Sequence, residues 1–486
     1  MDVRRARRGT AMNLRPNIHV PARALCIALL LATSALASAR EPIATTVAAV
    51  PAHGIIGVEE RHLDPGHWIR LLGADAERPY LDADAIAAHN ARLLAEDDSV
   101  RDMAEFPLEV DGAQVRAWIE ALSERPTAER YDVEGKPVER GFFDTLERDM
   151  ALDAIPDRVQ PRFGLAVDRA DLRAFPTTRR IFSTAGDVDI DRLQESGLFP
   201  GDALAVLHTT ADGSWSFVAS DRYLAWMETS RLATGTREQT AAYRNRTPSL
   251  LVTGATARTV FNPVRPDISE LQLDMGVRVP VLADWPADGQ VHGQHPAFGH
   301  VIELPARRAD GSLEFVPALL PRTAEVAAEP LPLTPANLIR QGFRFLGERY
   351  GWGHSFNARD CSGFVSEIYR SMGVQLPRNT RDQAVSPAFD KTVLTAESSR
   401  EERLAAVADM QVGDLIYIPG HVMMMIGRDN GMTYVIHDTS GTGYRGADGD
   451  YVRMSLSGVV VTALEPMMSG RETDTIDRIT SIVRIR

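Results

Sequence analysis

Outside a predicted N-terminal export segment the chain has a single cysteine, Cys361, and this feature limits both how it can fold and what it can do. The sequence has two cysteines, and the other, Cys26, lies in that segment. A chain with one thiol cannot form an internal disulfide, so its fold must be held without one. An unpaired thiol outside the cytoplasm is exposed to oxidation, and its presence calls for a chemical explanation.

The first 39 residues have the features of a secretory signal peptide. Six arginines form a basic region, an apolar run covers 24–37, and either Ala35-Leu36-Ala37 or Ala37-Ser38-Ala39 offers a small-residue cleavage site. The run is too short to predict a membrane span. Cys26 precedes most of the apolar run, which argues against lipid attachment, and Met12 is an alternative start. We therefore expect an exported protein of the periplasm or cell envelope, without a transmembrane anchor.

Length and charge restrict the class of protein. A chain of 486 residues is too long for one ordinary core and predicts two to four domains. Removal of residues 1–39, which carry six arginines and one aspartate, takes the formal charge from −13 to −18. So acidic a protein is a poor candidate for binding nucleic acid.

The pattern of predicted helices and strands divides the remaining chain into four domains and one linker. Residues 40–158 read mostly as helix and loop, with helices predicted over 82–94 and 115–122. Residues 159–238 contain short strands at 202–207, 215–218 and 223–227, which suggest a small barrel. Residues 239–325 repeat that texture. The proline-rich stretch 326–334 reads as a linker, and residues 335–486 form the last domain, opening with a helix whose N-cap is Thr334.

Cys361 lies at the start of a predicted helix. Residues 364, 365, 368, 369 and 372 are apolar at helical spacing, Gly373 fits a C-cap, and Asp360 is placed as the N-cap. On the first turn, unpaired N–H groups and the helix dipole favour a thiolate, so we expect a lowered pKa for Cys361. The same N–H groups can hold an oxyanion. The alternative is a buried structural cysteine.

Two histidines supply a base for such a thiol. His421 opens the predicted strand 422–426, and His437 closes the predicted strand 434–436. Two antiparallel strands joined by a turn at 428–431 would bring both side chains to one end of a sheet. His421 is then the predicted base and His437 the residue that orients it, although either histidine alone fits an ordinary role at a strand end.

The motifs around these residues resemble the NlpC/P60 family of papain-like cell-wall cysteine peptidases. The matching stretches keep the family's order and cover residues 346–353, 360–365, 376–384, 412–415, 420–422 and His437. The resemblance implies an α+β papain-like domain in which Cys361 is the nucleophile, His421 the base and His437 the third polar residue, with Tyr350 lining the oxyanion site. His354 departs from the glycine usual after Trp-Gly, and the connection between the two histidines is longer than in compact members; both changes could reshape the substrate groove.

Upstream, stretches 171–177, 212–215 and 223–226 resemble the bacterial SH3-like domain of multidomain NlpC/P60 proteins. The resemblance implies an N-terminal, mostly helical domain, two SH3-like β-barrels, and then the papain-like domain. In that subgroup the residues flanking the nucleophile, here Asp360 and Ser362, bind the free α-amine of a short muropeptide, and a tyrosine from the SH3-like domain assists. Tyr223 is the candidate, with a barrel-core aromatic as the other interpretation.

The predicted function is therefore hydrolysis of the γ-D-glutamyl-L-diamino acid bond of peptidoglycan stem peptides, with neither metal nor nucleotide cofactor. His292, His295 and His300 lie close together but lack a cysteine or carboxylate at ligand spacing, so a metal site is not predicted there. Two alternatives remain: a wall-binding protein without activity, in which the SH3-like modules dominate, and an amidase or acyltransferase with the same papain-like site.

Overall fold

The computed structural model describes residues 54–445 and 449–486. The predicted signal peptide, its cleavage sites, Cys26 and Met12 lie outside the described residues. Within those residues, none of the helices combines the length and the apolar character that a membrane crossing requires.

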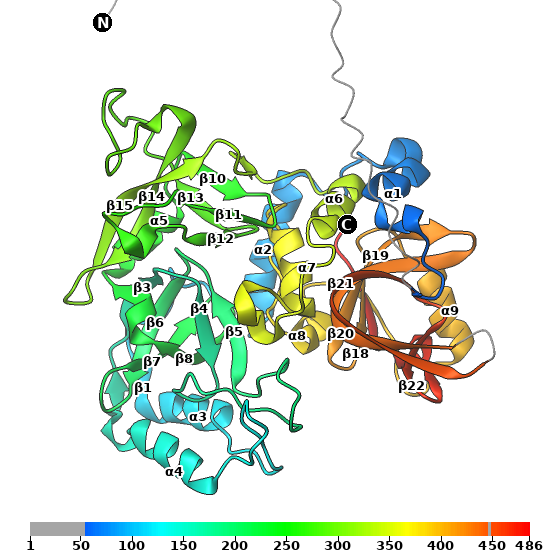
Figure 1. Cartoon of the computed structure of the whole chain (residues 1–486), viewed down its shortest axis with the longest axis horizontal. Coiled ribbons are helices and arrows are strands. Elements are labelled where there is room, and N and C mark those ends of the chain that lie inside the picture. Colours follow the sequence, from blue (N-terminus) through cyan, green and yellow to red (C-terminus); the bar gives the residue numbers. More distant parts are fainter. Residues whose placement is uncertain (1–53, 446–448) are drawn as a thin grey trace, which may run out of the picture. The chain divides into compact units, whose positions relative to one another are not determined.

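The C-terminal domain is built on an eight-stranded sheet with helices against it (Figure 1). The sheet runs in the order β17 (Asp390–Val393), β24 (Ser481–Arg484), β18 (Leu415–Ile418), β19 (His421–Asp429), β20 (Met432–Arg445), β22 (Met467–Gly470) and β23 (Thr473–Asp474), and β21 (Tyr451–Ala463) also pairs with β20. The helices are α6 (Pro335–Phe343), α7 (Cys361–Arg370), α8 (Thr380–Val385) and α9 (Arg400–Ala408). This α+β arrangement confirms the predicted fold class of the domain.

Helix α7 forms as the sequence predicts. Asp360 is its N-cap, and one carboxylate oxygen accepts the backbone N–H of Gly363 at 2.8 Å. Phe364, Val365 and Ile368 are fully buried against the sheet, and Gly373 has the positive φ of +82° that lets the chain leave the helix. The helix thus presents its first residue, Cys361, toward β19.

The predicted strand end at His437 is wrong. Strand β20 continues to Arg445, because β21 pairs with it on both sides of His437, from Tyr434↔Ala463 to Arg445↔Tyr451. His437 therefore lies inside a long strand. Its backbone is held by the ladder with β21 and not by a strand terminus.

Residues 158–234 form the first β-rich domain. Its seven antiparallel strands follow the order β5-β4-β8-β7-β6-β3-β9, and three of them match the predicted strands closely: β6 (Ala203–Thr209), β7 (Trp215–Ser220) and β8 (Leu224–Glu228). The others are β3 (Arg162–Ala166), β4 (Ala170–Arg173), β5 (Gln194–Leu198) and β9 (Leu232–Thr234). Phe217 and Trp226 are fully buried between the sheet and the helices that cover it.

A second small β-rich domain follows helix α5 (Arg237–Arg244). It contains β10 (Ser249–Val252), β11 (Thr256–Arg258), β12 (Gln272–Asp274), β13 (Arg278–Pro280), β14 (Gly299–Arg307), β15 (Leu313–Pro321) and β16 (Val326–Ala327). Strand β16 pairs with β10, so Val326 and Ala327 belong to this domain. The linker therefore begins after Ala327 and not at residue 326 as predicted.

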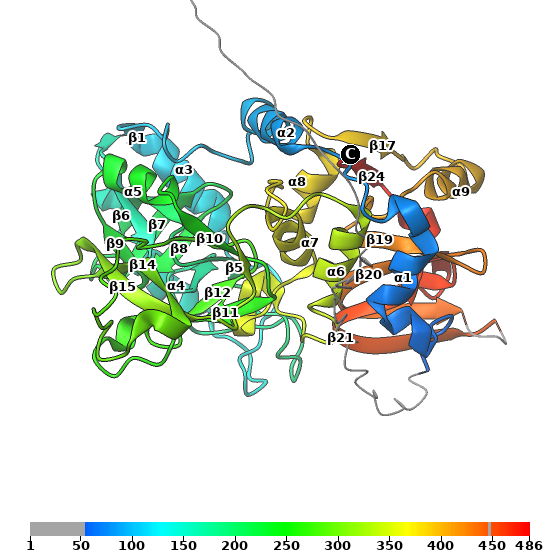
Figure 2. The same cartoon turned by 90° about the horizontal axis from the view of Figure 1, so that it is seen from above.

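The N-terminal helices contribute to two cores and do not enclose one of their own. Trp68 of α1 (Pro65–Leu72) and Leu93 of α2 (Ala83–Glu96) are buried in the core of the C-terminal domain. Val115 of α3 (Gly112–Leu122) and Phe143 of α4 (Arg140–Asp149) pack into the first β-rich domain. Figure 2 shows α1 beside α6 and β19, which it contacts.

Candidate active site

Cys361 is 5% exposed at the first turn of α7, next to the start of β19. The backbone N–H of Val422, the residue after His421, lies close enough to the thiol of Cys361 to lower its pKa. Helix α7 and strand β19 pack against each other over their lengths. The thiol and the histidine that the sequence singled out therefore lie at the same junction of helix and sheet.

His421 and His437 form the predicted pair. Nε2 of His421 is 2.7 Å from Nδ1 of His437, and Nε2 of His437 is 3.0 Å from the hydroxyl of Thr462. If Nδ1 of His421 is free to accept a proton, its Nε2–H donates to His437, whose own Nε2–H then donates to Thr462. This chain fixes one tautomer for both rings and stabilises an imidazolium at His421.

The predicted lowering of the thiol pKa is wrong for this structure. Burial raises the pKa of Cys361 to about 12, and the negative charge of Asp360 adds to it, while the Val422 N–H opposes it only in part. Burial likewise lowers the pKa of His421 to about 4. The resting pair is therefore a neutral thiol and a neutral imidazole, and thiolate can form only when the proton passes to His421 during attack.

This resting state predicts slow alkylation of Cys361. At pH 7 we expect iodoacetamide to label it more slowly than free cysteine, with the rate rising toward alkaline pH, because the thiolate is the reacting species. Mass spectrometry of the protein measures the labelling, with Cys361→Ala as the blank. Labelling faster than free cysteine at pH 7 would show a preformed thiolate. Slow labelling therefore does not separate an enzyme from a wall-binding protein; hydrolysis must be measured.

Asp360 and Ser362 lie in one buried cluster centred on Arg378. The Arg378 guanidinium donates to both carboxylate oxygens of Asp360 at 3.1 and 2.8 Å and to the hydroxyl of Ser362 at 2.7 Å. Burial raises the pKa of Asp360, but the charge and hydrogen bonds of Arg378 outweigh it and hold the pKa below its ordinary value. Asp360 also accepts backbone N–H groups of Gly353 and Gly363, so its oxygens are fully engaged.

Tyr223 extends from the first β-rich domain toward this cluster. It is half-buried, its hydroxyl donates to Glu195 at 2.5 Å, and the charges of Arg378 and Asp360 both act on it. Burial raises the pKa of Glu195; the hydrogen bond from Tyr223 and the charges of Arg378 and Arg173 oppose this only in part. The two residues thus form a hydrogen-bonded pair close enough to Arg378 for its charge to act on both of them.

Tyr350 is also brought to the thiol. It is 7% exposed, and burial, together with the nearby charge of Asp360, raises its pKa well above the ordinary value. Its hydroxyl therefore stays protonated and can donate a hydrogen bond at neutral pH.

His354 does not line an open groove. It is 3% exposed, adopts a positive φ of +66°, and lies beneath α7 with Nδ1 accepting from Arg378 at 2.9 Å and Nε2 3.2 Å from Glu367. Its ring approaches the position a Cβ would take at Gly363, and its own Cβ lies against Gly197 of β5. A glycine here would remove a buried contact between the two domains.

Arg378, Glu195 and Thr462 were not predicted as site residues. Arg378 lies within a motif quoted for the family resemblance, which was the available signal. Glu195 and Thr462 carry no local signal, because each meets its partner only after strands distant in sequence have paired.

Histidine clusters elsewhere have ordinary hydrogen-bonding roles. Nδ1 of His292 is 2.8 Å from the Asn262 side chain, and His295 caps a short turn by accepting from Ala297. In the described ranges one group, His62, His67 and Asp429, brings ligand-type atoms within 4.8 Å of one another. Because Nδ1 of His62 accepts the Glu59 N–H at 2.9 Å, its Nε2 carries the proton and donates to Asp429. This is a contact that docks the N-terminal segment onto the β19–β20 hairpin, not an open ligand set.

The fold and this geometry define an α+β domain with a cysteine at a helix N-terminus and two hydrogen-bonded histidines on the strands β19 and β20. Residues 347–461 match the NlpC/P60 family, and residues 180–228 match the SH3 domain of SH3b1 type. An NlpC/P60 domain therefore occupies the C-terminal part of the chain, with an SH3 domain ahead of it.

Two curated relatives and one solved structure resemble the chain. It is 30% identical over 226 residues to a gamma-D-glutamyl-L-lysine dipeptidyl-peptidase from Bacillus cereus (43% of this chain, 55% of that protein). It is 26% identical over 152 residues to a probable endopeptidase from Corynebacterium glutamicum (31% and 57%). It thus spans a little over half of each. An NlpC/P60 endopeptidase structure from Photobacterium damselae subsp. piscicida, 16% identical, superposes with a TM-score of 0.67 over 86% of this chain and 96% of that one. At that identity the likeness concerns the fold alone.

Proposed function

We propose that the protein is an exported cysteine peptidase that hydrolyses the γ-D-glutamyl-L-diamino acid bond of peptidoglycan stem peptides. The observation that carries the proposal is the buried Cys361 thiol at the start of α7, beside a His421–His437–Thr462 hydrogen-bond chain. The name of the Bacillus cereus relative supports the choice of bond.

The proposed mechanism follows from the neutral resting pair. The sulfur of Cys361 attacks the γ-glutamyl carbonyl carbon while its proton passes to Nδ1 of His421. The backbone N–H at the start of α7 and the Tyr350 hydroxyl stabilise the oxyanion. His421 then protonates the amine of the leaving diamino acid, and a thioester remains. Water, deprotonated by His421, attacks the thioester and releases a free γ-carboxylate and the thiol.

The free amine of a dipeptidyl substrate needs a carboxylate with unused lone pairs. Asp360 and Ser362, the predicted amine ligands, are hydrogen-bonded to Arg378. We therefore assign them to the base of the pocket, and we assign binding of the ammonium to Glu195 together with Tyr223. An ammonium beside Glu195 compensates a buried carboxylate whose pKa is raised by desolvation. An acetylated N-terminus would bury an uncharged amide there and leave Glu195 without a cation.

This assignment predicts a strong preference for a free N-terminus. L-Ala-γ-D-Glu-diamino acid should be cleaved with a kcat/KM about 100-fold or more above its N-acetylated form, because the amine pocket is charged and buried. Glu195→Gln should reduce that ratio to about tenfold or less by slowing the free peptide. The exposed Glu329→Gln is the matched control and should leave the ratio unchanged. Equal cleavage of both peptides by the unaltered enzyme would refute the amine pocket.

A further inference from the structure

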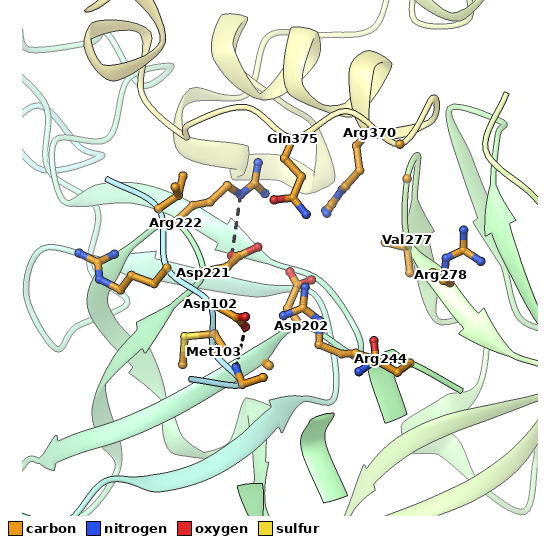
Figure 3. A pocket seen from close by; sticks show the side chains of 18 of the residues that line it. Asp102, Met103, Asp202, Asp221, Arg222, Arg244, Val277, Arg278, Arg370 and Gln375 are labelled. Atoms are coloured by element: carbon orange, nitrogen blue, oxygen red, sulfur yellow. Dashed lines mark hydrogen bonds and ion pairs between the residues drawn. The ribbon is translucent and has the colours of Figure 1, made fainter. Parts of the chain in front are cut away.

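A cavity of about 590 Å³ lies where the domains meet (Figure 3), and Cys361 is not among the residues that line it. Its walls come from the segment after α2, the β5–β6 and β7–β8 turns, α5, the turn before β13, and the end of α7. A volume of this size suits a small molecule, for which pockets of roughly 300–1,000 Å³ are usual. None of the predicted catalytic residues lines it.

The cavity is rich in arginine. Five arginines line it, against three aspartates; the arginines are Arg101, Arg222, Arg244, Arg278 and Arg370, and the aspartates are Asp102, Asp202 and Asp221. Its ionic side chains therefore carry a formal excess of two positive charges, in a chain whose formal charge is −13. The positive charge is therefore concentrated in the cavity and is opposite in sign to the charge of the chain as a whole.

The aspartates offset these arginines only in part: the charges of Asp202 and Asp221 act on Arg222 and Arg370, but five guanidinium groups line the cavity. Asp102 and Asp202 accept backbone N–H groups of Ala104 and Phe199. Asp221 lies 3.8 Å from Arg222, the ion pair drawn in Figure 3.

Arg370 is the least satisfied of the group. Its Nη2 is buried and, among the described residues, has no hydrogen-bond partner. Burial lowers the pKa of Arg222, and the positive charge of Arg370 lowers it further, so the two guanidinium groups repel each other. In Figure 3 the Arg222, Arg244 and Arg370 side chains surround the same space.

We propose that this cavity binds a small polyanion carrying at least two carboxylate or phosphate groups. Planar guanidinium groups bind either oxyanion through paired N–H donors, and two negative charges match the excess of the lining. A bound polyanion would bridge the N-terminal segment, both β-rich domains and the far end of α7. The proposal is independent of the peptidase reaction, since its test is binding and no catalytic residue is altered.

The test uses citrate and pyrophosphate as the two probes, each titrated into the purified protein at constant ionic strength against sodium chloride. We expect a saturable rise in Tm and binding heat with at least one probe. A response to citrate alone assigns a polycarboxylate, and a response to pyrophosphate alone assigns a phosphate ligand. Arg244→Gln/Arg370→Gln should weaken binding at least about tenfold, because each variant side chain removes a charge-assisted hydrogen bond.

Two controls keep the result interpretable. Arg478→Gln makes the same chemical change at an exposed site outside the cavity and should leave affinity unchanged. Arg370→Gln alone is also measured without ligand, because it removes the repulsion from Arg222 together with the attraction of Asp202 and Asp221, and its ligand-free Tm gives the baseline for the double variant. No saturable response to either probe, or equal binding by the double variant, would overturn the proposal.

Discussion

Replacing Cys361 with alanine is expected to abolish hydrolysis of L-Ala-γ-D-Glu-diamino acid while leaving the fold intact. Without the sulfur no thioester can form, and a nucleophile of this kind accounts for about 10⁴-fold or more of the rate in comparable enzymes. The side chain is small and its hydrogen bond is weak, so the free energy of unfolding should change by about 1 kcal/mol or less. Chromatographic assay of the products and thermal unfolding measure the two expectations.

The matched variant for this experiment is Cys361→Ser, which keeps a hydroxyl at the same position. Serine is a far weaker nucleophile beside a base whose pKa is near 4, so it should also be inactive. Turnover by Cys361→Ala with an unchanged unfolding transition would contradict the mechanism. A wall-binding protein without activity would give no turnover even with the unaltered chain. Turnover by the unaltered chain therefore separates the proposed peptidase from this alternative.

Replacing Arg378 with methionine is expected to have the largest effect on stability. The guanidinium is 4% exposed and donates to Asp360, Ser362 and Ser196, so its loss leaves a buried carboxylate without a cation. Removing one partner of a buried pair costs about 3–5 kcal/mol. Activity should fall as well, because Asp360 caps the helix that carries Cys361. Denaturant unfolding at pH 7 measures the loss of stability.

The pH dependence of that loss has a definite sign. In the unaltered protein the pKa of Asp360 is held below its ordinary value of 3.8, so its contribution is present above that pH and disappears as pH falls through the folded-state pKa. In Arg378→Met the charge and hydrogen bonds of Arg378 no longer oppose burial, so the pKa of Asp360 should rise and acidification should relieve the buried charge. The stability difference between the two proteins should therefore shrink as pH falls toward 4.

The exposed pair Arg340–Glu77 provides the control for this variant. Both side chains are more than 40% exposed, and Arg340→Met should cost about 0–1 kcal/mol with no dependence on pH near 4. If Arg378→Met destabilised the protein no more than this, the cluster would not hold the nucleophile helix as argued.

The nucleophile helix could be predicted because its signals are local. An N-cap at Asp360, apolar residues at helical spacing and Gly373 past the end act within a few turns of one another. The thiol pKa could not be predicted in the same way. The helix terminus favours the thiolate, but burial of the thiol in the folded chain outweighs it, and the charge of Asp360 adds to that effect.

The substrate side of the site depends on contacts between distant residues. Arg378 binds Ser196 across 182 residues of sequence, and Tyr223 meets Glu195 only because β5 and β8 both flank β4. For the same reason the two helices predicted at 82–94 and 115–122 gave no sign that they would pack into different cores. Periodicity identifies a buried face but not the surface that buries it.

The most direct test of the central claim is mass spectrometry of the products formed from L-Ala-γ-D-Glu-diamino acid by the unaltered protein and by Cys361→Ala. The proposed function predicts L-Ala-D-Glu and the free diamino acid from the first, and intact peptide from the second. Cleavage at any other bond, transfer of the acyl group to another acceptor in place of water, or the same products from Cys361→Ala would contradict it.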